Sequence, residues 1–101
     1  MKTKEQLIAE VENRTYDTIT EKKEADRIIT NFIKAIEIID LKKYKINVMS
    51  NPLRLTIKHK AFNDKINLFF KKGKFFLDEI PLQLSDIDNA LHCYFELDKK
   101  I

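Results

Sequence analysis

The chain has 101 residues with 19 Lys/Arg, 16 Asp/Glu and a formal net charge of +3, and 44% of its residues are hydrophobic. This length predicts one domain over residues 1–101, and the hydrophobic fraction excludes a disordered chain. A single Gly and a single Cys exclude glycine-rich phosphate loops and an intrachain disulfide. No apolar run reaches the ~20 residues of a membrane helix and no apolar signal segment opens the chain, so we expect a cytoplasmic protein that does not associate with membranes.

The charged residues are sorted into three blocks along the chain. Residues 1–40 carry a balance of −2 and residues 75–101 a balance of −4, whereas residues 41–74 hold 10 Lys/Arg against the single acid Asp64, a balance of +9. An excess of this size in a short segment predicts a surface that binds an anionic partner.

Two helices are predicted in the first block and one near the end. Thr3 to Gln6 has the form of a capping box and predicts a helix over residues 3–14. A second such box at Thr18 to Glu21, followed by a broad apolar stripe of period 3.6, predicts a helix over 20–41. Ser85, with acids after it, predicts the N-cap of a final helix that extends to about residue 97.

The basic block has the alternating pattern of strands. Residues 53–60 alternate apolar and polar, and 44–49, 65–71 and 74–80 are further predicted strands, the last ended by Pro81. Lys72-Gly73 forms the expected two-residue turn between the last two. The predicted fold class is α+β: a four-stranded antiparallel β-meander packed on one face by two N-terminal helices and one C-terminal helix, in the order ααββββα.

Strand parity divides the sheet into two faces, because successive side chains point to opposite sides. The Lys72-Gly73 turn places Phe69 opposite Phe76. The predicted core face holds Leu53, Leu55, Ile57, His59, Ile66, Leu68, Phe70, Phe75 and Leu77. The predicted outer face holds the lysines, the Phe69 and Phe76 pair, and Asn47, Thr56, Asn67 and Asp78.

The outer face is the predicted functional surface. Cations that meet phosphates, interleaved with rings that stack on bases, are typical of single-stranded nucleic-acid binding. The favoured hypothesis is a small non-enzymatic protein that binds single-stranded DNA or RNA, with Phe69 and Phe76 as the stacking rings. The expected phosphate contacts are Lys45, Arg54, Lys58, Lys60, Lys65, Lys71 and Lys74.

Other interpretations of the same face stay open. It could bind an acidic protein, as an inhibitor or adaptor encoded by a phage or mobile element does. The lysines could instead protect the sheet from edge-to-edge aggregation. Phe69 and Phe76 could be covered by a second copy in a homodimer, by the region of Tyr16, or by the loop that contains Phe62.

The sequence predicts no catalytic residue, no metal site and no cofactor. His92 and Cys93 are adjacent on a predicted helix, where their side chains point about 100° apart. One Cys and two His offer no metal-ligand spacing. Asp86 and Asp88 are interpreted as helix N-terminal charges rather than as an acid/base pair.

Overall fold

The computed structural model describes residues 2–97, which form an α+β fold. Its elements, in chain order, are α1 (Lys4–Thr18), α2 (Lys22–Ile38), β1 (Tyr44–Met49), β2 (Arg54–His59), β3 (Lys65–Lys71), β4 (Lys74–Leu77), β5 (Ile80–Leu82), the 3-10 turn η1 (Leu84–Asp86), α3 (Ile87–His92) and the π-helical turn η2 (Cys93–Leu97).

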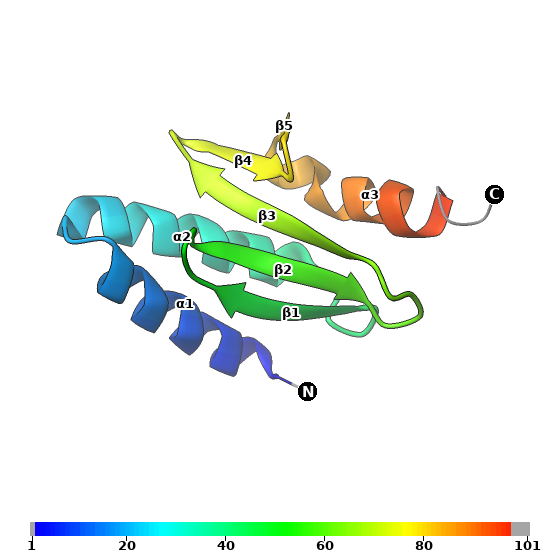
Figure 1. Cartoon of the computed structure of the whole chain (residues 1–101), viewed down its shortest axis with the longest axis horizontal. Coiled ribbons are helices and arrows are strands. Elements are labelled where there is room, and N and C mark those ends of the chain that lie inside the picture. The colour runs from blue at the N-terminus through cyan, green and yellow to red at the C-terminus, as the bar shows by residue number, and fades with distance from the viewer. Residues whose placement is uncertain (1, 98–101) are drawn as a thin grey trace.

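The strands form one antiparallel sheet of five strands in the order β1-β2-β3-β4-β5. Figure 1 shows α2 passing behind the strands and no helix in front of them, so that the front face carries no second layer from the described part of the chain. The core lies between the sheet and the helices, where strand residues such as Leu55 and Leu68 pack with Phe32 of α2 and Phe95 of η2, all at most 1% exposed. Each such side chain contributes roughly 1.5–3 kcal/mol by its removal from water.

The first helix confirms one predicted capping box and overturns the other. The Thr3 hydroxyl accepts from the Gln6 N–H at 3.2 Å, and the Gln6 side chain accepts from the Thr3 N–H at 2.8 Å. The second box, Thr18 to Glu21, was predicted to cap a helix over residues 20–41, but Thr18 is the last residue of α1. Thr15 adds one buried position to the stripe of Leu7 and Val11 beyond residue 14, and the Ile19 N–H donates to the Thr15 carbonyl at 2.7 Å, so α1 extends to the predicted cap. The second helix instead begins at Lys22, and its N-cap Glu21 makes no side-chain capping bond.

The predicted strand over 74–80 is wrong in its second half. Asp78 has a φ of 55°, which ends β4 at Leu77, and Asp78-Glu79 reverses the chain into a fifth strand. Pro81 lies within β5 rather than ending a strand. It is tolerated there because an edge strand has one side on which no N–H is needed.

The start of the C-terminal helix also differs from the prediction. Ser85 lies in the 3-10 turn η1 and is not an N-cap. The helix α3 follows directly from that turn, with Asp86 at the N-cap position and no side-chain capping bond. The Ile87 N–H donates to the Leu84 carbonyl of the 3-10 turn, and Asp86 has αR backbone angles, so the extended capping residue is Gln83, before η1.

The β3–β4 hairpin confirms the predicted turn and register. Lys72 and Gly73 have φ values of 54° and 76°, the two successive positive values of a type I′ turn. The pairs Phe69↔Phe76 and Leu68↔Leu77 follow as expected. Since register fixes which face each residue occupies, this turn determines the chemistry of both faces.

Candidate nucleic-acid interface

The open face of the sheet carries a row of lysines across three strands. Lys45 of β1 is paired with Lys58 of β2, which is paired in turn with Lys65 of β3. Like charges directly opposite each other destabilise a sheet. No ion pair joins any of the three to another residue of 2–97. The row therefore presents positive charge that the described chain does not neutralise.

A neutral polar row lies two residues further along the strands. It consists of Asn47, Thr56 and Asn67, each paired with the next. Thr56 Oγ1 donates to Asn67 Oδ1 at 2.9 Å, and Arg54 Nε donates to the same oxygen at 3.3 Å. These bonds hold the Asn67 side chain in one orientation at the centre of the face.

An aromatic pair follows beyond the neutral row. Phe69 is paired with Phe76, and Phe76 with Pro81, so an apolar stripe crosses β3, β4 and β5. Both rings are half-buried. The Lys71 ammonium lies 4.9 Å from the Phe69 ring centroid and 5.5 Å from that of Phe76. Such cation–π contacts contribute about 0.5–1 kcal/mol at exposed sites, so little stability would be lost if a stacked base displaced the lysine.

Two of the seven predicted phosphate contacts are occupied within the chain. The Arg54 guanidinium donates to the carbonyl oxygens of Ser50 and Pro52 at 3.3 and 2.8 Å, in addition to its bond with Asn67. Lys60 lies in the turn after β2, and its ammonium donates to the Leu41 carbonyl at 3.0 Å. The alternation of residues along the strands could not predict these bonds, because they depend on how the turns fold back onto the strands.

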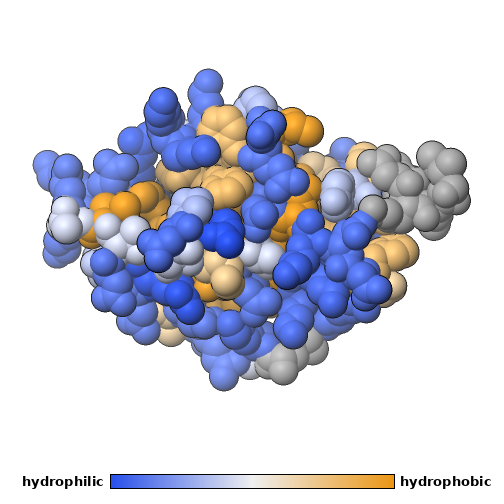
Figure 2. Space-filling view, in the orientation of Figure 1, coloured by the Kyte–Doolittle hydropathy of each residue, from blue (hydrophilic) through white to orange (hydrophobic). Residues whose placement is uncertain are grey.

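The remaining predicted residues lie on the same sheet with the aromatic pair between two groups of cations. Lys71 and Lys74 are paired at the hairpin end, and the three-lysine row lies toward the other end. Lys65 and Lys71 are six positions apart on β3, which is roughly 20 Å at strand rise. Figure 2, viewed onto this face, shows hydrophilic side chains over most of the surface with apolar ones gathered among them.

A shallow hollow that the sequence did not predict lies beside the aromatic pair. It is lined by Asn67, Phe69, Lys71, Asp78, Glu79 and Ile80. Because the last strand was predicted to continue to residue 80, Glu79 and Ile80 were assigned to that strand and not to a site. The Asp78-Glu79 pair, separated from Pro81 by one residue, was the available signal for a turn there.

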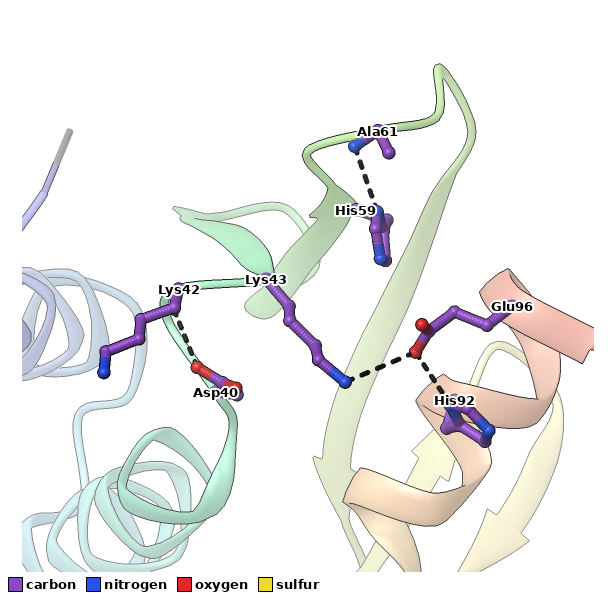
Figure 3. A network of polar contacts seen from close by, with 7 residues as sticks. All are labelled: Asp40, Lys42, Lys43, His59, Ala61, His92 and Glu96. Carbon is purple, nitrogen blue, oxygen red and sulfur yellow. Dashed lines mark hydrogen bonds and ion pairs between the residues drawn. The ribbon is translucent and has the colours of Figure 1, made fainter.

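A second polar cluster lies at the C-terminal end of the helical layer (Figure 3). Glu96 Oε2 lies 2.7 Å from His92 Nδ1 and 3.7 Å from Lys43 Nζ. The His92 hydrogen bond, assisted by Lys43, lowers the pKa of the Glu96 carboxyl below its usual value. These contacts link η2 to the segment before β1.

The predicted core-side histidine has a packing role beside that cluster. His59 Nδ1 accepts from the Ala61 N–H at 3.0 Å, and its ring packs against Tyr44, Phe62 and Phe95 at centroid distances of 4.8–5.8 Å. Phe62 therefore covers His59 rather than the aromatic pair of the open face. Among residues 2–97, no group of three His, Cys, Asp or Glu side chains could hold a metal ion.

No known protein family, curated protein or solved structure matches the chain. Among the described helices, none has the length and apolar character needed to cross a membrane.

Proposed function

We propose that the protein binds single-stranded nucleic acid through the open face of its sheet. The observation that carries this proposal is the row of Lys45, Lys58 and Lys65, which makes no ion pair among residues 2–97 and lies on the same face as the paired rings of Phe69 and Phe76. Cationic side chains attract phosphates, and aromatic rings stack on unpaired bases of any sequence. A duplex keeps its bases stacked inside, so the rings favour a single strand.

Five cations are available for phosphates in this arrangement, namely Lys45, Lys58, Lys65, Lys71 and Lys74. Each contact with a single strand contributes about −0.7 to the slope of log K against log salt, so five give a slope near −3.5. The stacking rings add affinity that salt does not screen, roughly 1–3 kcal/mol per base. Binding should therefore persist, weakened, at moderate salt.

Fluorescence anisotropy titrations with labelled single-stranded DNA, single-stranded RNA and duplex DNA at several salt concentrations test the proposal. We expect tighter binding to single strands than to duplex and a slope near −3.5, from about five contacts. Failure to bind any of the three at low salt would overturn the proposal.

Matched variants separate this face from general charge attraction. Lys58→Gln should weaken binding and reduce the slope by about 0.7. Lys34→Gln removes an exposed lysine from α2, on the helical side of the molecule, and should change neither quantity. Equal effects of the two substitutions would argue against a defined face.

A protein partner with an acidic surface is the second candidate. It is favoured by two exposed apolar side chains, Met49 at 39% and Ile80 at 70% exposure, which add apolar area on or beside this face. Capture of one defined partner that survives nuclease treatment and is abolished by Lys58→Glu would support it. Loss of every partner after nuclease would count against it.

A further inference from the structure

We infer that the hollow between β3 and the β4–β5 turn reads a guanine base of the bound strand. This inference rests on the proposed function and adds a base preference to it. Its basis is the lining of the hollow. The Phe69 ring forms one wall, and the polar side chains around it are hydrogen-bond donors and acceptors that make no ion pairs with one another.

The walls of the hollow suit a flat, apolar-faced ligand. Phe69 contributes one ring of the aromatic pair, and Ile80, 70% exposed, stands on the turn beside it. A nucleobase that stacks on Phe69 would cover part of Ile80 as well. Single exposed apolar residues are common on protein surfaces, but Ile80 shares the lining of this hollow with Phe69 and with four polar or charged residues.

The donors of the hollow come from β3. Arginine Nε is always a donor, so the Asn67 atom that faces it is the amide oxygen, and the amide NH2 is the group left for a ligand. Thr56 donates to the same oxygen and reinforces this orientation. Lys71, whose ammonium lies over the Phe69 ring, supplies a second donor.

The acceptors come from the turn. Asp78 Oδ1 accepts from the Asn67 backbone N–H at 3.1 Å, which ties this carboxylate to the strand. Glu79 is exposed, and within residues 2–97 its carboxylate makes no hydrogen bond or ion pair. It is the acceptor with both oxygens available to a ligand.

Among the four bases, guanine matches this set best. Its Watson–Crick edge carries two adjacent N–H donors, N1 and N2, which one carboxylate can accept together, and the O6 acceptor beside them suits Asn67 or Lys71. Adenine and cytosine offer one amino group, and thymine or uracil one N–H between two carbonyls. A carboxylate also repels phosphate, so this hollow suits a base edge while the backbone follows the lysines.

Competition between two oligothymidylates of about nine nucleotides, one with a single central guanine, tests the inference on the full chain. We expect the guanine-containing strand to bind about ten-fold more tightly, as one well-placed bidentate pair allows. Glu79→Gln should weaken binding of that strand and tighten binding of plain oligothymidylate, because a charge that repels phosphate is removed. Opposite changes of this kind cannot come from unfolding or from general charge attraction.

Controls distinguish the possible failures. Glu37→Gln makes the same charge change at an exposed position of α2 and should leave the preference intact. Guanosine monophosphate should bind far more weakly than the guanine-containing strand, since it cannot reach the three-lysine row. Equal affinity would point to a free nucleotide as ligand and overturn the inference. If wild type binds both oligonucleotides equally, the base preference is wrong while the proposed function stands. If it binds neither, both are wrong.

Discussion

The two faces of this sheet are built from the same strands and yet differ in burial and in side-chain chemistry. The face toward the helices is apolar and buried, with Leu55, Ile57 and Leu68 fully covered. The opposite face pairs lysine with lysine and phenylalanine with phenylalanine, and no described helix covers it. The buried face therefore supplies most of the stability, whereas the lysine pairs of the open face oppose it and are consistent with the proposed binding of an anionic partner.

Neighbouring residues on β3 provide the strongest test of this comparison. Leu68→Ala removes a side chain with 0% exposure and should lower the free energy of unfolding by about 3–4 kcal/mol. Phe69→Ala, one position away on the open face, should cost about 1 kcal/mol or less in stability, since its ring is only half-buried. Urea denaturation measures both.

Binding should respond to the same two substitutions in the reverse order. Phe69→Ala should weaken single-strand affinity by roughly five-fold or more through lost stacking. Leu68→Ala, where it remains folded, should bind like wild type. Equal stability losses at the two positions would contradict the contrast between the faces.

Alkaline titration tests the buried side through Tyr44. Burial, together with nearby carboxylates, raises the pKa of its hydroxyl from 10.0 to about 12. The unfolded chain ionises first, so this contribution to stability is intact below pH 10 and is lost as pH rises toward 12. The loss should reach at most about 2.7 kcal/mol. Chemical denaturation at several alkaline pH values, with Tyr44→Phe as the control that lacks this dependence, measures it.

The buried hydroxyl of Thr15 in α1 predicts a smaller change in the free energy of unfolding, opposite in sign to the losses above. Thr15 has 0% exposure, and its hydroxyl has no hydrogen-bond partner among residues 2–97. Thr15→Val keeps the shape and removes the unsatisfied group, so it should raise the free energy of unfolding by about 1 kcal/mol. Thr15→Ser, which keeps the hydroxyl, should not stabilise the protein; a gain from both would point to another cause.

The smallest expected effect concerns the lysine row itself. Lys58 lies between Lys45 and Lys65, so Lys58→Thr should relieve two repulsions and stabilise the protein by a few tenths of a kcal/mol at low salt. The gain should disappear at high ionic strength, where surface charges are screened. Thermal unfolding at two salt concentrations measures it, and a gain that is independent of salt would assign it to strand propensity instead.

The sequence predicted best what is determined by local geometry. The Lys72-Gly73 turn needs two positive φ values, and once it is identified the pairing of Phe69 with Phe76 follows by counting. Thr3 and Gln6 are close in sequence and satisfy each other at the helix start, so the first capping box was also correctly predicted.

The errors occurred where tertiary packing prevailed over a local signal. Thr18 has the form of a cap, but it is the exposed last residue of α1, whose buried stripe reaches as far as Thr15. Arg54 and Lys60 alternate correctly with the core residues, yet their charged groups bond to backbone carbonyls of turns. The hollow at Glu79 depends on where β4 stops, and strand ends are the least predictable part of a sheet.

The sheet has one further property, which concerns how the protein folds. Because the strand order β1-β2-β3-β4-β5 repeats the chain order, each strand pairs with its sequence neighbour and no crossover has to form first. Chains whose contacts are mostly local fold faster than those that must close long loops. The meander can therefore assemble one hairpin at a time, and the open face and the face that packs on the helices acquire their register in the same step.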